Sequence, residues 1–171
     1  ALWVVGGAEA NHYNMDLTAA VFDTGGADTY TFLARAPGAY QLVIDASGDD
    51  LYESSADLAG PAAALFSVAI LIDRSGQDRY LSHHLGAIAA GLFGVGILID
   101  ESGDDRYVND TPGAGWSQGI GFYGAGILID RGGGLRQHRH GSVSYEDLGG
   151  DRRLEGVHHA RGWRALSDRI A

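Results

Sequence analysis

The chain has 171 residues, no cysteine, 27 glycines and a formal net charge of −10 at pH 7. The lack of cysteine excludes disulfide frameworks and thiolate metal sites, and the acidic balance argues against nucleic acid as a partner because phosphates would be repelled. The length suits one domain that buries a core, and a hydrophobic content of 45% predicts packed structure rather than disorder.

The charge is distributed unevenly along the chain. Residues 1–130 hold 17 acidic residues and 4 Arg, whereas residues 131–171 hold 5 acidic residues and 8 Arg. An acidic body of this kind favours cations as ligands. Two apolar stretches, 58–72 and 85–99, are about fifteen residues long, short of the roughly twenty that a spanning helix needs, so we predict no membrane span.

One eight-residue phrase, Asp-x-x-Gly-x-Asp-x-Tyr, recurs along the chain. Four complete copies and a fifth, incomplete one begin at Asp23, Asp45, Asp73, Asp100 and Asp130. Self-similarity at a period of roughly 27 residues is typical of a solenoid, in which each repeat is one coil stacked on the last.

The residues ahead of four of these copies predict β-strands. They are short apolar runs rich in β-branched side chains, at 42–44, 70–72, 97–99 and 127–129. Because side chains alternate along a strand, we expect Ile72, Ile99 and Ile129 to stack as an aliphatic ladder inside the coil. The Asp-x-Tyr that ends each complete copy predicts a second short strand, and its tyrosines are expected to stack in a column.

Each phrase also predicts a tight turn. Asp is favoured at the first position of a type I turn, where its carboxylate accepts a nearby backbone N–H, and Gly is favoured at the fourth position. All five copies have Asp and Gly at this spacing.

These elements predict an all-β fold, a parallel β-helix (β-solenoid) of about five coils over residues 1–133. The alternative is an α/β solenoid in which residues 61–66 or 86–93 form a helix. Whether residues 1–22 form an irregular first coil or an N-terminal cap is open. Residues 134–171, where the repeat stops, are expected to form an irregular C-terminal cap or a flexible tail.

Stacked coils would bring like charges to about 5 Å from one another, at a cost of up to a few kcal/mol for each repulsion where screening is poor. Three arrangements would offset this cost. Ca²⁺ takes six to eight oxygen ligands from carboxylates and backbone carbonyls. Arginines in or beside the phrases could pair with the acids, namely Arg74, Arg79, Arg106 and Arg131. The carboxylates could instead point into water.

The candidate metal ligands are the aspartates at the first and sixth positions of the phrase. They are Asp23, Asp28, Asp45, Asp50, Asp73, Asp78, Asp100, Asp105 and Asp130. For the first-position aspartates, turn formation alone is the competing interpretation. Asp49 and Asp104 have Ala27 and Gln77 as their counterparts in sister copies, so we expect them to be solvated or auxiliary.

Three segments resemble the Gly-x-Asp-x-(large apolar) half of the RTX calcium repeat: residues 48–52, 76–80 and 103–107. In that family the turns of a parallel β-roll hold Ca²⁺ between coils, so the resemblance implies a structural Ca²⁺. RTX units follow every nine residues, while these are about 27 apart, and Asp-x-Ser or a similar sequence replaces the leading Gly-Gly. The pattern is also similar to bacterial secreted repeat proteins, which implies a secreted or cell-surface location.

The C-terminal segment carries four histidines, His138, His140, His158 and His159. Neutral imidazoles bind zinc well, but this spacing is not a recognised zinc pattern. Solvated histidines are therefore the default interpretation.

Because the phrase repeats, it indicates a structural ladder more than a single catalytic centre. We predict a non-catalytic, calcium-stabilised repeat scaffold for adhesion or assembly that self-associates, or meets neighbouring coils, through open strand edges. The alternative is a β-helix protein that binds or cleaves polysaccharides as a lyase or glycosidase. Arg79 and Arg106 with Asp78 and Asp105 are the only group we would nominate for such chemistry, and no catalytic residue is assigned.

Overall fold

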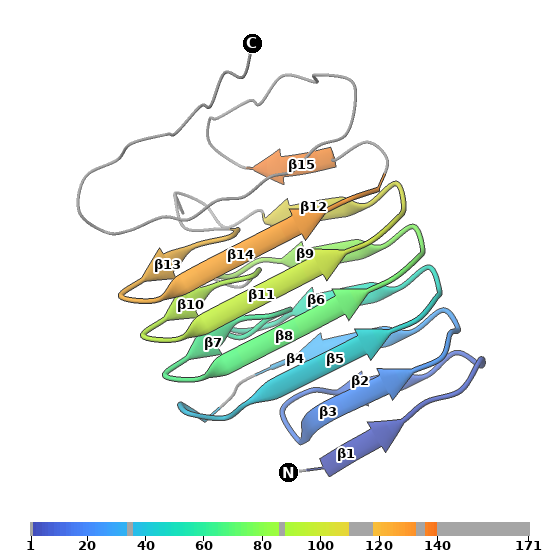
Figure 1. Cartoon of the computed structure of the whole chain (residues 1–171), viewed down its shortest axis with the longest axis horizontal. Helices are drawn as coiled ribbons and strands as arrows, with labels where there is room; N and C mark the ends of the chain where they lie inside the picture. Colours follow the sequence, from blue (N-terminus) through green and yellow to red (C-terminus); the bar gives the residue numbers. More distant parts are fainter. Residues whose placement is uncertain (1, 34–35, 86–87, 110–117, 133–135, 140–171) are drawn as a thin grey trace.

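The computed structural model describes residues 2–33, 36–85, 88–109, 118–132 and, for the backbone alone, 136–139. All regular structure in these residues is β-strand, arranged in three sheets, and they contain no helix (Figure 1). Every pairing between named strands is parallel. The predicted all-β class is confirmed at this level.

The first six-stranded sheet, called sheet A, has the order β1-β3-β5-β8-β11-β14. Its strands are β1 (Leu2–Val5), β3 (Thr18–Asp23), β5 (Gln41–Asp45), β8 (Val68–Asp73), β11 (Val95–Asp100) and β14 (Ala125–Asp130). From β5 to β14 the strands pair residue for residue without a bulge. Equivalent positions of successive repeats are therefore direct neighbours.

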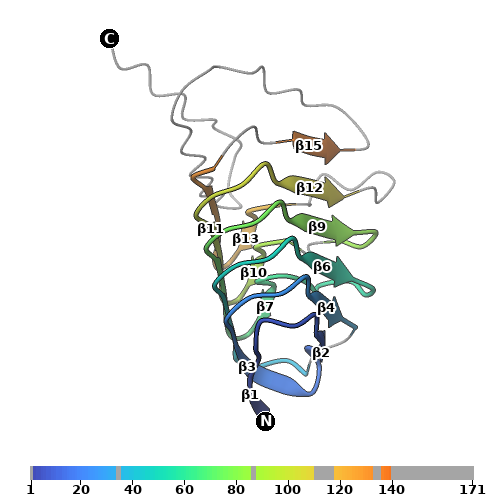
Figure 2. The same ribbon diagram turned by 90° about the vertical axis from the view of Figure 1, so that its right-hand side faces the viewer.

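The second six-stranded sheet, sheet B, has the order β15-β12-β9-β6-β4-β2 and lies opposite sheet A (Figure 2). Its strands are β2 (His12–Asn14), β4 (Thr29–Phe32), β6 (Leu51–Ser54), β9 (Arg79–Ser82), β12 (Arg106–Asn109) and β15 (Arg136–Arg139). A short third sheet, sheet C, joins β7 (Ala64–Leu65), β10 (Gly91–Leu92) and β13 (Gly121–Phe122). The chain visits sheets A and B in turn, so strand neighbours within a sheet come from successive repeats.

The described residues form no helix at 61–66 or 88–93, so the α/β alternative is wrong for these segments. Residues 61–66 contain a turn and β7, and the described part of 86–93, residues 88–93, contains β10. Backbone conformation explains the difference, because four non-glycine residues in these segments have a positive φ. Ala62, Phe66, Ala89 and Phe93 have φ of 56°, 50°, 49° and 47°, and a right-handed helix excludes such values.

The structure answers part of what the sequence left open at the two ends. Residues 2–14 supply β1 and β2, which pair with β3 and β4 and so add a repeat ahead of Asp23. At the other end, the backbone of β15 pairs with β12. The predicted cap or tail otherwise lies outside the described residues, as do the side chains of the four C-terminal histidines. In the described part of the chain no helix is long and apolar enough to cross a membrane.

The interior is filled by inward-facing side chains of sheets A and B. Val43, Leu71, Leu98 and Leu128 are buried on sheet A. The expectation that Ile72, Ile99 and Ile129 form the inner ladder is wrong, because they lie partly exposed on the outer face. Each strand ends in a buried Asp, and alternation then places the Leu inside and the last Ile outside.

Candidate metal centre

Two columns of aspartates meet inside the corner where sheet A leads into sheet B. The first column ends the strands of sheet A and consists of Asp23, Asp45, Asp73, Asp100 and Asp130, paired in register. The second column lies just ahead of the strands of sheet B and consists of Asp28, Asp50, Asp78 and Asp105. All nine side chains are at most 5% exposed, so the alternative in which they point into water is wrong.

The first-column carboxylates form the predicted turns. Oδ1 of Asp23 accepts the backbone N–H of Gly25 at 2.8 Å, and Oδ1 of Asp45 accepts that of Ser47 at 3.1 Å. Asp73 and Asp130 make the same bond to the residue two positions on. One oxygen of each of these carboxylates is thereby committed to its own turn.

The other oxygen of the first column accepts a tyrosine hydroxyl. The rings of Tyr13, Tyr30, Tyr52, Tyr80 and Tyr107 stack with centroids 4.6–4.9 Å apart, which confirms the predicted column. Tyr52 donates to Asp73 Oδ2 at 2.6 Å, and Tyr80 donates to Asp100 Oδ2 at 2.9 Å. Burial raises the pKa of these hydroxyls, so they remain protonated donors.

The second-column carboxylates connect successive repeats. Oδ1 of Asp50, Asp78 and Asp105 accepts the backbone N–H of the preceding member of the column, at 2.6, 2.7 and 2.9 Å. Asn11 donates the equivalent bond to Asp28 at 2.6 Å. Asn11 and Tyr13 are therefore a degenerate copy of the Asp-x-Tyr ending, which the repeat phrase did not predict because Asn11 stands where the phrase has Asp.

The second oxygen of this column receives no hydrogen bond. Oδ2 of Asp28, Asp50, Asp78 and Asp105 is buried without a donor, and so is Oδ1 of Asp100. These carboxylates gather into three triads in which ligand oxygens lie within 4.8 Å of one another. The triads are Asp23–Asp28–Asp45, Asp50–Asp73–Asp78 and Asp78–Asp100–Asp105. Of the predicted ligands, only Asp130 belongs to no triad.

Burial and mutual repulsion make these carboxyls weak acids. Desolvation is the main cause, and it raises the pKa of Asp50 to about 8, that of Asp78 to about 10 and that of Asp100 to about 8. Neighbouring carboxylates raise these pKa values further. No Arg or His is buried among the described residues, so no basic side chain balances the columns. The carboxyls must hold protons or share a metal cation.

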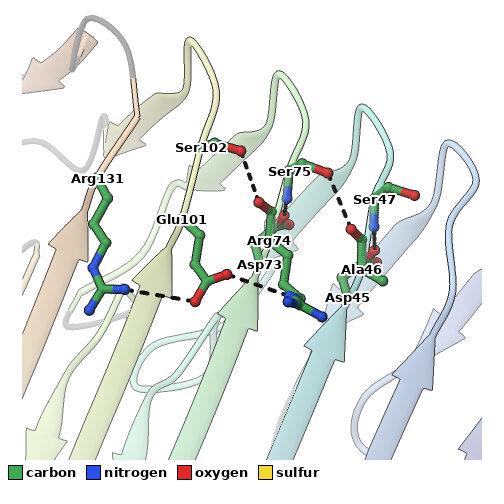
Figure 3. Close-up of polar contacts among 9 residues, drawn as sticks. All are labelled: Asp45, Ala46, Ser47, Asp73, Arg74, Ser75, Glu101, Ser102 and Arg131. Atoms are coloured by element: carbon green, nitrogen blue, oxygen red, sulfur yellow. Dashed lines mark hydrogen bonds and ion pairs between the residues drawn. The ribbon is translucent and has the colours of Figure 1, made fainter.

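The arginines that might have neutralised the columns lie outside them. Glu101 pairs on the outer surface with Arg74 at 3.5 Å and Arg131 at 3.8 Å (Figure 3). Arg79 and Arg106 are exposed on sheet B, whereas Asp78 and Asp105 are buried. Pairing with arginine therefore does not neutralise the aspartate columns. The four residues nominated for polysaccharide chemistry are also separated, because the two arginines lie on the outer face of sheet B and the two aspartates lie in the interior.

The fourth-position glycines let the turns stack in close contact. A Cβ on Gly76 would collide with the carbonyl oxygen of Gly48 in the preceding repeat, and one on Gly103 would collide with that of Gly76. Hydroxyls continue the ladder through the turns, because Ser75 Oγ donates to the Ala46 carbonyl at 3.2 Å and Ser102 Oγ donates to that of Arg74 at 2.9 Å (Figure 3). The turns thus hold the aspartates of adjacent repeats at strand spacing.

Comparisons with protein-family models, curated proteins and solved structures found no match. The chemistry of the site therefore follows from its own donors. Each triad offers oxygen ligands alone, in a buried setting with uncompensated negative charge. Such a set can hold a metal ion, and it fits a hard cation better than one that prefers nitrogen or sulfur.

Proposed function

We propose that the chain is a β-solenoid scaffold whose stacked repeats are held together by Ca²⁺ bound at the aspartate triads. The observation that carries the proposal is the row of buried, donor-free Oδ2 atoms on Asp28, Asp50, Asp78 and Asp105, with no buried basic side chain among the described residues. A divalent cation would balance this charge and occupy these unused acceptors.

The placement of the triads supports a role in holding repeats together. Each triad takes aspartates from two successive repeats, as in Asp50 of one repeat with Asp73 and Asp78 of the next. An ion bound there requires the repeats to be stacked. Ca²⁺ binding and folding are therefore coupled, and binding to the native state alone adds about 2.7 kcal/mol at a hundredfold excess over Kd.

Burial of the columns supports a structural rather than a catalytic role. The carboxylates are at most 5% exposed, so a polysaccharide cannot approach them as it would a cleft. The same arrangement also recurs along the chain. We infer a non-catalytic scaffold for adhesion or assembly, acting as a secreted or cell-surface protein, where calcium levels suit sites of modest affinity.

The test is thermal unfolding of the metal-free protein with and without CaCl₂, together with the variant Asp78→Asn. Asp78 belongs to two triads, and its Oδ1 bond to the Asp50 N–H can be kept by the Asn carbonyl. We expect CaCl₂ to raise the Tm of the parent protein and to raise that of the variant far less. Asp49→Asn is the matched control, because Asp49 is exposed, belongs to no triad and accepts only the N–H of Gln77 in the described contacts.

Terbium luminescence gives a second readout that is independent of stability. Tyr52 and Tyr80 donate hydrogen bonds to carboxylates of the triads, so a bound Tb³⁺ should be sensitised by tyrosine excitation and displaced by Ca²⁺. A Tm unaffected by CaCl₂ and no sensitised emission would overturn the calcium proposal.

A further inference from the structure

The outward face of sheet A is a continuous aliphatic surface. Its side chains on the four in-register strands are Leu42 and Ile44, Val68, Ile70 and Ile72, Val95, Ile97 and Ile99, and Ala125, Ile127 and Ile129. None of them carries a charge or a hydrogen-bonding group. All remain partly exposed, since the described part of the chain places no element over them (Figure 1). We call this set the aliphatic face.

The outward face of sheet B shows that stacking alone does not require such a surface. On β9 and β12 the outward positions alternate a charged and an apolar residue, as Arg79 with Leu81 and Arg106 with Val108. The backbone ladder is the same in both sheets. The aliphatic face therefore results from the side chains of sheet A and not from the backbone pairing that both sheets share.

The sequence of sheet A is typical of strands that are covered on both sides. Parallel strands that are buried on both faces have near-continuous apolar sequences, whereas strands with one solvent-exposed face alternate apolar and polar residues. The run Ile97-Leu98-Ile99 is of the first kind, although only Leu98 faces the interior. Contiguous apolar surface of this extent marks an interaction site.

An exposed aromatic column borders the start of the same strands. Phe66, Phe93 and Tyr123 have φ of 47–50° and exposures of 47–71%. The equivalent residue one repeat earlier is Gly38 at φ 84°, whose N–H bonds to the next repeat as those of Phe66 and Phe93 do. Glycine meets this backbone requirement without strain, so the three aromatics are kept at a cost.

The geometry of this column favours an apolar partner over a sugar. The rings stack on one another with centroids 4.9 and 5.3 Å apart and planes within 7°. Most of their flat faces are thereby covered. A glycan binds to open ring faces and to hydrogen-bonding groups, and the aliphatic face supplies none of the latter.

We propose that the aliphatic face is a dimerisation surface that packs face to face on the same surface of a second copy of this chain. The four strands of the aliphatic face, about 4.8 Å apart and about 20 Å long, give roughly 400 Å² of flat area, and the exposed Phe66, Phe93 and Tyr123 beside them enlarge it toward the roughly 800 Å² that each partner contributes to a standard interface. In-register strands align the side chains in parallel ridges, and two such ridged faces can interdigitate as stacked sheets do.

Charge predicts how salt affects a dimer of two copies. The charged row Arg74–Glu101–Arg131, which follows the strands of the face, is already paired within the chain and needs no partner. Two copies carrying −10 each repel one another over the rest of their surface. Added salt screens this repulsion, so dimerisation should strengthen as NaCl rises. A contact driven by opposite charges would weaken instead.

The experiment is sedimentation velocity of the full chain over a concentration series, with CaCl₂ present to keep it folded, at low and high NaCl. We expect a monomer–dimer equilibrium that high salt strengthens. Ile97→Glu, at the centre of the face, should raise the dimer Kd at least about a hundredfold, because a carboxylate from each copy enters an apolar interface. Ile97→Thr, which keeps a β-branched side chain, should raise it less.

Val108→Glu is the matched control, since Val108 is also a partly exposed outward residue of a central parallel strand, but on sheet B. It should leave the dimer Kd unchanged, and circular dichroism should show the same fold for all variants. A parent chain that stays monomeric at high concentration and high salt overturns the proposal. So does an equal effect of both Glu variants, or a dimer that Val5→Pro at the edge strand β1 disrupts while Ile97→Glu does not.

Discussion

The inner and outer sides of the turns differ in how the charges of their side chains are balanced. On the inner side, nine aspartates are buried at strand spacing with no basic partner among the described residues. On the outer side, Arg74, Glu101 and Arg131 alternate in sign and pair in water. One backbone ladder positions both rows, so the difference lies in what each row requires. The outer row is complete within the chain, whereas the inner row needs protons or a cation from solution.

The buried aspartates, rather than the exposed ion pairs, should make the protein sensitive to pH and to calcium. Exposed ion pairs contribute little, with a median of about 0–1 kcal/mol. Buried carboxylates change protonation or bind metal before they tolerate an uncompensated charge. Changes in pH or calcium should therefore act through the inner row, and the outer row serves as its internal control.

The largest effect is expected from pH in the absence of metal. The pKa of Asp50, Asp78 and Asp100 in the folded chain is raised to about 8, 10 and 8, above the ordinary value of 3.8. The stabilisation by the bound protons is complete below about pH 4 and is lost progressively as pH rises from about 4 to the folded-state pKa values of 8 to 10. Urea unfolding of metal-free protein should show a stability lower at pH 8 than at pH 5 by on the order of 4 kcal/mol or more.

Calcium should reverse this dependence, because it binds the ionised form. Repeating the titration with CaCl₂ should give a larger stabilisation at pH 8 than at pH 5. Metal-free protein that is more stable at pH 8 than at pH 5 would contradict the description of the inner row as uncompensated.

The next largest effect should come from changing the distance between turns. Gly76→Ala places a Cβ against the Gly48 carbonyl, so adjacent repeats must separate where the triad Asp50–Asp73–Asp78 forms. We expect a loss of about 3 kcal/mol in urea unfolding, together with weaker Ca²⁺ binding. Gly7→Ala is the control, since nothing lies within 4 Å of a Cβ at Gly7. Equal stability of the two variants would show that the turns are not in close contact.

A smaller effect is expected from removing one hydroxyl of the tyrosine column. Tyr80→Phe keeps the stacked ring but takes the donor from Asp100 Oδ2. Leaving this buried acceptor with one donor fewer should cost about 1–2 kcal/mol and raise the pKa of Asp100 further. Chemical denaturation measures the cost, and Tyr123→Phe, on an exposed ring, should change stability by less than about 0.5 kcal/mol. No difference between the two would show that the hydroxyl is dispensable.

The smallest effect should come from the outer row. Glu101→Gln removes the charge that Arg74 and Arg131 share, and all three side chains are exposed by a third or more. We expect a change below about 1 kcal/mol, falling toward zero in high salt. A loss comparable to that of Gly76→Ala would erase the contrast between the two sides of the turn.

Much of the candidate site followed from spacing alone. The Asp-x-x-Gly turn is a local structure, and a bond from its carboxylate to a nearby backbone N–H was predicted from Asp and Gly at fixed positions; the structure shows that this N–H lies two residues on. The tyrosine column followed from the same repeat. The role of Asn11 was not predicted because it replaces the Asp of the phrase, although Tyr13 two residues later was a usable signal.

The inside and outside of sheet A were assigned wrongly because the run Ile-Leu-Ile is apolar on both sides. The alternation of side chains along a strand shows which residues share a face but not which face is the inner one. The inner face is identified only by the Asp that ends the strand, which is buried in the structure. The helix predicted as an alternative failed for a different reason. Alanine and aromatic residues adopt a positive φ at two corners of the repeat, and the conformational preferences of these residue types do not predict such values.

By itself the sequence determined the repeat, the strands, the turns and the residue types in each column, because these depend on spacing along one chain. Only the tertiary structure decided that the carboxylates lie inside, that the arginines lie outside and that each triad spans two repeats. These facts depend on which residues of different repeats meet across the parallel ladder and on which side of it they lie, and both are set when the repeats stack.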